Sequence, residues 1–395
     1  MNLQLYISIV EKILGVEGVQ PTDNLFSLGG DSLSAVSICN EVYETCGVSV
    51  DFRFIFRFST VESQALYLKN LYVTTNYMNS SQALSTEVLK SGWPPNLSLD
   101  GEVKNKNRTA AFVLSSPRSG STLLRVMLAG HTKLFVPPEL HLLPYQNLAT
   151  RKQILQAANG IYLEGTIRAV MEAQKCTVDD AICIMDNLEL QELPTKKFYQ
   201  LLQKWIGERV LVEKTPGNAS RIEALYNIEN WFDEPLYVIL VRHPLATINS
   251  MLQYDKEFFH HFDLGVTSEK NLRYNELTWA LPYYNILQFM EKIPRDRYFI
   301  VRFEDLLQKQ QHVMENICQF LKIDFCEEVL QPYQNKQHKM LDGIKQIEFA
   351  VGDHKFHQYR SIHPEVATAW KASSIADLPL SDISWEIARK FGYTK

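Results

Sequence analysis

Long hydrophobic runs are missing from this sequence of 395 residues. No stretch approaches the roughly 20 apolar residues that a membrane-spanning helix needs. Glu11 and Lys12 fall where a secretory signal peptide would have its apolar core. We therefore expect no membrane span and no leader, and a cytoplasmic location.

Cysteine motifs and excess positive charge are also missing. The six cysteines include no CxxC pair, which disfavours a zinc site or a disulfide framework. The net charge of -5 gives no support to nucleic-acid binding, although a local basic pocket for a small polyanion stays compatible with it. With 46% hydrophobic and 22% charged residues, the composition is that of an ordinary globular protein.

Helical periodicity dominates the N-terminal part of the chain. Three helical segments are predicted, over residues 3–15, from Asp31 and Ser32 to about residue 43, and over residues 61–71. They predict a small all-α bundle over residues 1–73. Residues 74–108 are rich in Ser, Asn and Thr and predict a linker, with a short helix around residues 83–90.

The pattern changes from residue 109 to residue 395. Compact apolar runs typical of buried strands occur at residues 110–114, 210–212, 236–241 and 298–301. Helical segments separate them, and this alternation predicts a parallel sheet with helices on its faces. The expected fold class is therefore a P-loop-like α/β domain preceded by the all-α bundle.

The string LGGDSL at residues 28–33 places Ser32 at a junction between a loop and a helix. A carrier protein needs an exposed hydroxyl there, because a phosphodiester then lies near the positive end of the helix dipole. The alternative is that Ser32 merely caps its helix. The string resembles the attachment site of acyl and peptidyl carrier proteins, which implies a 4′-phosphopantetheine arm on Ser32, with Asp31 presenting the site to the modifying enzyme.

A second loop, SPRSGST at residues 116–122, follows the first predicted strand. It lacks the lysine of a Walker A loop, which disfavours a nucleoside triphosphatase, and has Arg118 instead. The loop resembles the 5′-phosphosulfate loop of sulfotransferases that use 3′-phosphoadenosine 5′-phosphosulfate (PAPS). The resemblance implies that Arg118 and four further residues bind the donor: Ser119, Gly120, Ser121 and Thr122.

Two later segments extend this resemblance. Arg242 ends a predicted strand and Ser250 follows eight residues later, as in the 3′-phosphate segment of the same family. Lys214, at the end of another predicted strand, resembles the family's lysine, which stabilises charge on the oxygen that leaves. Each of these residues, alone, could be an ordinary surface or helix residue.

The base that accepts the proton of the acceptor hydroxyl is less defined. The segment PPELHLLP at residues 137–144 resembles the region that carries the glutamate base of tyrosylprotein sulfotransferases. This implies Glu139 as base, with His141 positioning it or sharing the task. His260 and His261, in an aromatic and acidic stretch, remain rivals.

Two C-terminal segments have weaker signals. Residues 300–306 resemble a recurrent strand and turn of the sulfotransferase fold, for which we expect a stabilising role. Lys355 and Arg360 belong to a basic segment that closes over the donor or is simply solvated, since the family's GxxGxxK pattern is absent there.

Together the resemblances imply an enzyme that sulfates a hydroxyl, β to the thioester carbonyl, of an acyl or peptidyl chain on the Ser32 arm. Similar carrier and sulfotransferase pairs occur in olefin-forming polyketide synthases. The implied partners are a phosphopantetheinyl transferase, an upstream synthase or synthetase module and a downstream thioesterase, for which this chain has no room. No metal, nucleic acid or membrane is expected.

Two alternatives stay open. The enzyme could sulfate a free small molecule or a tyrosyl group, or a degenerate transferase fold could present the carrier to partners without catalysis. The intact set of Arg118, Lys214, Arg242 and Ser250 argues against degeneracy.

Overall fold

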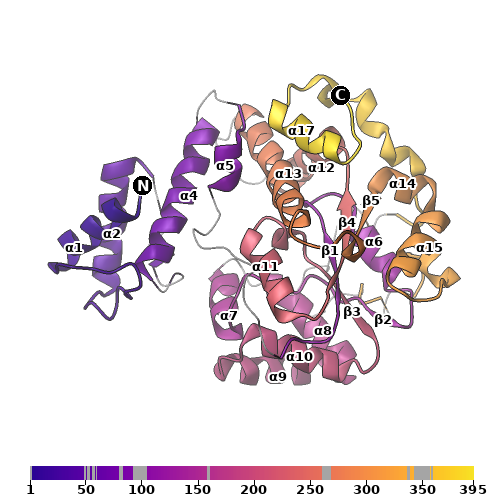
Figure 1. Ribbon diagram of the computed structural model, residues 1–395, viewed down its shortest axis with the longest axis horizontal. Helices are drawn as coiled ribbons and strands as arrows, with labels where there is room; N and C mark the ends of the chain where they lie inside the picture. The colour runs from indigo at the N-terminus through magenta and orange to yellow at the C-terminus, as the bar shows by residue number, and fades with distance from the viewer. Residues whose placement is uncertain are drawn as a thin grey trace. The chain divides into compact units, whose positions relative to one another are not determined.

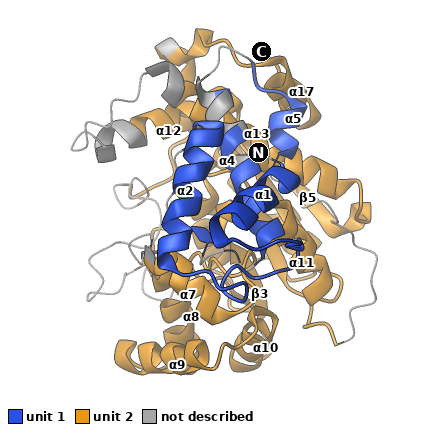
Figure 2. Cartoon of the chain, turned by 90° about the vertical axis from the view of Figure 1, so that its left-hand side faces the viewer, with its two compact units in different colours: residues 1–96 blue, residues 97–395 orange. Residues whose placement is uncertain are grey.

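The chain forms two compact units, residues 1–96 and 97–395 (Figure 2). The computed structural model describes residues 2–48, 50, 54–55, 58, 60–79, 83–91, 105–157, 161–259, 268–335, 339–341, 356 and 359–395. Among the described helices, none has the length and apolar character needed to cross a bilayer.

Helices make up the N-terminal unit: α1 (Leu3–Leu14), α2 (Ser32–Cys46), α4 (Val61–Asn79) and α5 (Thr86–Lys90). The side chain of Asn2 caps α1, and Gly15 ends it in the left-handed conformation. The apolar faces meet in one core that includes Tyr6, Val10, Ile38, Val42 and Leu68. The predicted all-α bundle is confirmed, and α4 continues to Asn79, eight residues beyond the expected end.

A five-stranded parallel sheet with the order β2-β3-β1-β4-β5 organises the second unit. The strands are β1 (Ala111–Leu114), β2 (Leu134–Phe135), β3 (Val210–Lys214), β4 (Leu236–Val241) and β5 (Tyr298–Arg302). The predicted parallel α/β fold is confirmed. Strand β2 was not predicted, because two residues carry no periodicity.

The α-helices of this unit are α6 (Ser121–Leu128), α7 (Leu148–Ala157), α8 (Glu164–Gln174), α9 (Val178–Leu190), α10 (Thr195–Trp205), α11 (Ile222–Trp231), α12 (Pro244–Phe259), α13 (Ser268–Met290), α14 (Phe303–Gln308), α15 (Gln310–Phe320) and α17 (Asp382–Lys390). Helices α11 and α13 cover one face of the sheet, whereas α6, α14 and α15 cover the other (Figure 1).

Alternation along the strands decides which side chains meet which helices. Val113 and Val238 belong to the aliphatic core under α6, α14 and α15. Tyr237 faces the other way and meets Phe289 of α13 with 5.2 Å between ring centroids. Both faces of the sheet are therefore buried, as parallel sheets require.

The strand order also locates the crevice. The chain moves from β1 outward to β2 and back through β3, and it then crosses to β4 and β5 on the other side of β1. The connection after β1 runs toward one edge of the sheet, and the connection after β4 runs toward the other. Parallel sheets bind ligands at such a point, beyond the carboxyl ends of the strands.

Candidate active site and carrier serine

Ser32 is the first residue of α2 and is exposed. The cap of this helix is Asp31, whose side chain accepts from Ser34 N at 2.8 Å, while Ser34 Oγ accepts from Asp31 N at 2.6 Å. The alternative that Ser32 is the cap therefore does not hold. Its hydroxyl lies at the helix start without the capping duty that serines often have there.

The two glycines before Ser32 allow the loop to fold tightly. Gly29 has a φ of 93°, in the left-handed region. At Gly30, a Cβ atom would lie 2.7 Å from the backbone oxygen of Leu25. Neither position tolerates a larger residue without a shift of the loop.

The loop after β1 is fixed from within by a chain of hydroxyl groups. Ser116 Oγ lies 2.7 Å from Ser119 Oγ, which lies 2.9 Å from the hydroxyl of Tyr283. The Tyr283 hydroxyl donates to the carbonyl of Leu240 at 3.0 Å. Because the single hydroxyl proton of Tyr283 is used there, Ser119 donates to Tyr283, and its hydroxyl serves the protein interior.

Gly120 occupies the N-cap of α6 with a φ of 85°. A Cβ atom at this position would lie 2.1 Å from the ring of Phe303. No side chain of the described residues caps α6. The first N–H groups of this helix are therefore turned toward whatever binds at the loop, which favours an anion.

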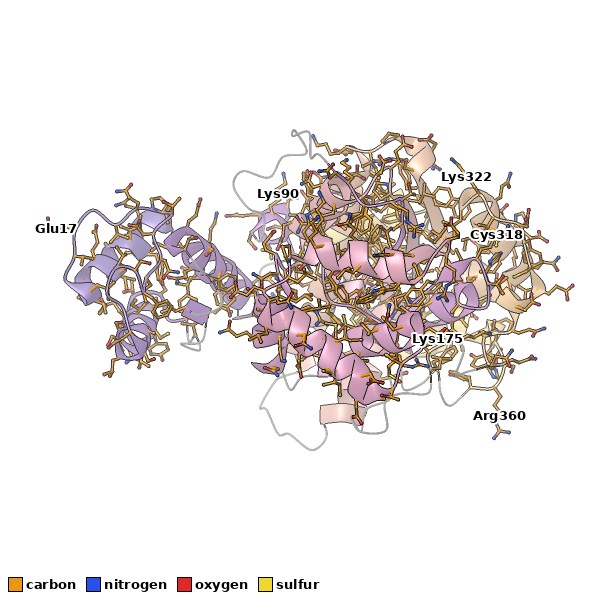
Figure 3. All side chains as sticks on the ribbon, turned by 90° about the horizontal axis from the view of Figure 1, so that it is seen from below. Glu17, Lys90, Lys175, Cys318, Lys322 and Arg360 are labelled. Carbon is orange, nitrogen blue, oxygen red and sulfur yellow. The ribbon has the colours of Figure 1, made fainter. Side chains whose placement is uncertain are left out.

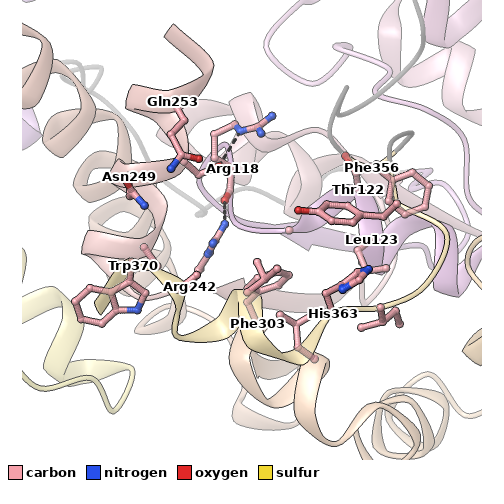
Figure 4. A pocket seen from close by; sticks show the side chains of 18 of the residues that line it. Arg118, Thr122, Leu123, Arg242, Asn249, Gln253, Phe303, Phe356, His363 and Trp370 are labelled. Atoms are coloured by element: carbon pink, nitrogen blue, oxygen red, sulfur yellow. Dashed lines mark hydrogen bonds between the residues drawn. The ribbon is translucent and has the colours of Figure 1, made fainter. Parts of the chain in front are cut away.

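A cavity of about 230 Å³ opens between the loops that follow β1 and β4. Arg118 and Arg242 line it side by side, and Arg242 Nη1 donates to the backbone oxygen of Arg118 at 3.0 Å (Figure 4). Arg118 Nε donates to Ser250 Oγ at 3.4 Å. Arg242 and Ser250, which were paired by their spacing, thus line one cavity, and the structure adds Arg118 beside them, which the spacing did not predict. This donor set suits a phosphate.

The other walls of this cavity are largely apolar and aromatic, and include Leu123, Phe303, Leu307, Tyr333, Phe356, Tyr359, Ile362 and Trp370. The guanidinium of Arg242 lies over the Phe303 ring, 4.7 Å from its centroid. Flat apolar walls beside two cations fit a ligand that combines an aromatic ring with phosphate groups.

The remaining loop residues lie around this cavity in different ways. Gly120 and Thr122 line it. Ser119 and Ser121 are buried and are not among the lining residues. Their backbone N–H groups are the parts that remain suited to a ligand at the helix start.

Lys214, the last residue of β3, is 1% exposed and forms an ion pair with Oε1 of Glu139. His141 Nε2 lies 3.4 Å from Oε2 of the same carboxylate. The three residues predicted to take part in catalysis are therefore brought together from two segments of the chain.

The electrostatic surroundings of Glu139 act in opposite directions. Burial alone would raise the pKa of Glu139, but the Lys214 ammonium and the His141 imidazole together hold it well below its ordinary value. Glu139 is therefore an ionised, tightly held carboxylate.

The loop that carries Glu139 and His141 has its own supports. Arg151, fully buried in α7, donates from Nη2 to the carbonyl of Leu140 at 2.8 Å and from Nε to that of His141 at 3.0 Å. On the other side, Leu140 N donates to Thr215 Oγ1 at 3.1 Å. A Cβ atom on Gly165 of α8 would lie 2.0 Å from the backbone oxygen of Glu139, so only glycine allows α8 to pack this closely.

Glu213 anchors the same region from the core. It accepts bonds from Asn218 Nδ2 at 3.0 Å and Thr215 Oγ1 at 3.3 Å, and from the hydroxyl of Tyr199. Burial raises the pKa of Glu213 to about 7 against the opposing effect of these hydrogen bonds. Its protonation state therefore changes near neutral pH.

Several predicted residues contribute less. Arg360 is exposed and extends away from the surface (Figure 3), although Tyr359 and Ser361 line the cavity. His260, His261 and Lys355 lie outside the described residues.

Sequence reasoning missed the supporting residues. Arg151, Gly165 and Tyr283 belong to no motif, and Tyr283 acts on a residue 164 positions away. A local signal existed for two others: Thr215 directly follows Lys214 in the lysine-bearing segment, and Phe303 lies in the segment of residues 300–306 that resembles a recurrent turn.

Comparison with known proteins gives two family matches. The model of the sulfotransferase family matches residues 110–327, and the model of the phosphopantetheine attachment site matches residues 7–68. The second match contains Ser32, and the first contains Arg118, Glu139, Lys214 and Arg242.

Two solved structures resemble the chain at 34% identity. One is a sulfotransferase domain from the curacin biosynthetic pathway, with a TM-score of 0.65 over 73% of this chain and 99% of that domain. The other is a sulfotransferase domain from the olefin synthase of Synechococcus PCC 7002, with a TM-score of 0.66 over 75% and 98%.

Among curated proteins, tyrocidine synthase 2 of Brevibacillus parabrevis is 33% identical over 66 residues, which are 17% of this chain and 2% of that protein. Gramicidin S synthase 2 of Brevibacillus brevis is 33% identical over 60 residues, or 15% of this chain and 1% of that protein. The chain thus spans only a very small part of these relatives.

Proposed function

The chain belongs to the sulfotransferase family, and from this premise we propose that it transfers a sulfuryl group from PAPS to a hydroxyl of an acyl or peptidyl chain tethered to Ser32. The observation that carries the proposal is the position of Arg118, Lys214 and Arg242. Arg118 and Arg242 follow β1 and β4, and Lys214 ends the neighbouring strand β3, where it is paired with an ionised Glu139.

The residues around the cavity fit the donor. Arg242 and Ser250 would hold the 3′-phosphate, and Arg118 with Thr122 and the start of α6 would hold the 5′-phosphate end. Gly120 is required at the helix start, because a Cβ atom there would collide with the ring of Phe303. PAPS supplies an activated sulfuryl group, so the protein has to orient it and stabilise charge on the oxygen that leaves.

Lys214 has two tasks that it cannot perform at the same time. Its ammonium group holds Glu139 in the present arrangement, and transfer requires the same group at the oxygen that leaves the sulfuryl group. When Lys214 turns to that oxygen, Glu139 loses the strongest influence that lowers its pKa. The carboxylate then becomes a stronger base at the step in which the acceptor hydroxyl loses its proton.

His141 is the second candidate base. Its ring contacts the Tyr162 ring edge-on, with 4.7 Å between centroids, and its backbone is in the left-handed region at a φ of 48°. The imidazole is thus aimed at Glu139 and held there. It orients the carboxylate while Lys214 is engaged elsewhere.

The arm on Ser32 determines the acceptor. The hydroxyl of Ser32 is exposed and does not cap its helix, which suits attachment of phosphopantetheine by a transferase. The resemblance to sulfotransferase domains of the curacin pathway and of an olefin synthase supports a β-hydroxyacyl chain on that arm. An upstream synthase or synthetase module would supply this chain, and a thioesterase would act on the product.

The test loads Ser32 with synthetic β-hydroxyacyl-pantetheine chains, adds PAPS and measures the intact mass of the protein. The expected result is a mass gain of one sulfuryl group on the arm. Matched reactions offer the same hydroxyacyl group as a free pantetheine thioester, and a tyrosyl peptide. Sulfation of only the free acceptors would contradict the tethered substrate, and no sulfation of any acceptor would contradict the enzyme itself.

A further inference from the structure

We infer that Glu304 and Tyr393 are positioning residues for Arg242, and that they set the affinity for the 3′-phosphate of the donor. This rests on the proposed use of PAPS. Neither residue is among the residues that line the cavity. Both act on the turn between β4 and α12, where Arg242 leaves the sheet.

Glu304 is the bridge. Its Oε1 accepts from the backbone N–H of His243 at 3.0 Å, one residue after Arg242. Its Oε2 lies 2.5 Å from the hydroxyl of Tyr393, which also lies 3.1 Å from the carbonyl of Val241, one residue before Arg242. The backbone N–H of His243 is thus bonded to Glu304, and the carbonyl of Val241 lies against the Tyr393 hydroxyl, whose single proton goes to Glu304.

The pair is built to hold this geometry. Tyr393 is only 3% exposed, and the guanidinium of Arg302 lies over its ring, 4.3 Å from the centroid. Burial and the nearby Glu304 carboxylate raise the pKa of Tyr393, so its hydroxyl keeps its proton and donates. Each oxygen of Glu304 therefore has a defined donor, the His243 N–H or the Tyr393 hydroxyl, at a partly buried position.

Phe303 connects the same turn to the other side of the cavity. Its ring lies under the guanidinium of Arg242 and against the space left by Gly120. The carbonyl of Arg242 accepts from Trp279 Nε1 at 3.1 Å. Glu304, Tyr393 and Trp279 thus contact the backbone at and beside Arg242. Phe303 contacts both the Arg242 guanidinium and Gly120, which belongs to the loop that carries Arg118.

The experiment measures equilibrium binding of adenosine 3′,5′-bisphosphate and of adenosine 5′-monophosphate to the full chain. The variant is Tyr393→Phe, which keeps the ring and removes the bond to Glu304 together with the hydroxyl contact to Val241. We expect about 10-fold weaker binding of the bisphosphate and a smaller loss for the monophosphate, since Arg242 is proposed to contact the 3′-phosphate directly and reaches the loop of Arg118 only through one bond to its backbone oxygen. The KM for PAPS should rise by the same factor, with kcat little changed.

Glu304→Gln is the second variant. The amide oxygen can still accept from the His243 N–H, and the amide NH₂ can donate to the Tyr393 hydroxyl, whose proton then turns to the Val241 carbonyl, so only the charge of the carboxylate is lost and the effect should be smaller than in Tyr393→Phe. The preference for the bisphosphate should fall in the same direction as in Tyr393→Phe.

A matched control exists at the other end of β4. There the hydroxyl of Tyr237 donates to Glu229 at 2.5 Å, and Arg297 pairs with the same carboxylate at 2.7 Å. Tyr237→Phe removes an equivalent buried bond without touching the turn of Arg242, so the preference for the bisphosphate should stay that of the unmodified protein.

The outcomes separate the inference from the function on which it rests. If Tyr393→Phe and Glu304→Gln weaken both nucleotides equally, or if Tyr237→Phe has the same effect, the positioning role is wrong. If the unmodified protein does not prefer the bisphosphate, the proposed PAPS site is wrong. A preference lost only in the Tyr393 and Glu304 variants supports both.

Discussion

The two sites of this chain are built in opposite ways. Ser32 lies exposed at a helix start, and its neighbour Asp31 has taken over the capping role, so the hydroxyl has no structural duty. In the second unit Lys214 is fully buried and ion-paired, and Arg151 and Thr215 hold the backbone of the loop that carries Glu139 and His141. This contrast agrees with the proposed roles, since a site for modification by another enzyme needs an accessible group, whereas a site that stabilises a transition state needs groups held in place.

The largest effect is expected at Ser32. Ser32→Ala removes the hydroxyl to which we propose that the arm attaches, so treatment with a phosphopantetheinyl transferase and coenzyme A should add no mass. Because the cap is Asp31, the melting temperature should stay unchanged and free acceptors should still be sulfated. Labelling that persists in Ser32→Ala would show that the arm is attached elsewhere.

The next effect concerns Lys214, the buried cation that is paired with Glu139. Lys214→Met keeps the aliphatic stem and removes the charge, and we expect kcat to fall about 10²- to 10³-fold. The pKa of Glu139 should rise, because burial then acts with less opposition. A pH profile of kcat/KM checks this: its acidic limb should move to higher pH than in the unmodified enzyme, and an unmoved limb would disconnect Lys214 from Glu139.

The two candidate bases, Glu139 and His141, differ in how strongly their replacement should lower kcat. Glu139→Gln should lower kcat about 10²-fold or more, as loss of a general base does. His141→Asn should lower it less, about 10-fold, because the imidazole orients the carboxylate. Single-turnover rates with a saturating donor measure both, and a larger loss in His141→Asn would transfer the role of base to His141.

The smallest effect concerns stability. The pKa of Glu213 is about 7 in the folded protein, above the value of an unfolded glutamate. The folded state therefore binds a proton that the unfolded state has lost, and stability falls as pH rises from about 4 to 7, by about 3 kcal/mol at most. In Glu213→Gln the difference in melting temperature between pH 5 and pH 8 should shrink by a few degrees. An unchanged difference would show that Glu213 does not titrate in this range.

The sequence predicted local structure well, and long-range pairing poorly. Four strands and the parallel α/β fold followed from apolar runs and their alternation with helices. The pairing of Lys214 with Glu139, 75 residues apart, could not follow from spacing, because it depends on how β3 and the loop of residues 137–144 are brought together. The same holds for Tyr393, which acts on a turn 152 residues away.

The segment of residues 300–306 shows the limit most clearly. Its resemblance to a recurrent turn predicted only a stabilising role. In the structure the Phe303 ring packs against the guanidinium of Arg242 and leaves no room for a Cβ atom at Gly120. Glu304 accepts a hydrogen bond from the backbone N–H of His243. A pattern identifies the turn, but only the fold shows which loop it touches.

The most direct test of the whole account compares tethered and free acceptors in one enzyme. The single-turnover rate of sulfuryl transfer is measured on a β-hydroxyacyl chain loaded on Ser32, and on the same chain as a free pantetheine thioester at equal concentration. Tethering raises the effective concentration of the acceptor, so the account predicts faster transfer to the loaded arm. Equal rates, or a faster reaction with the free thioester, would contradict the claim that Ser32 delivers the substrate.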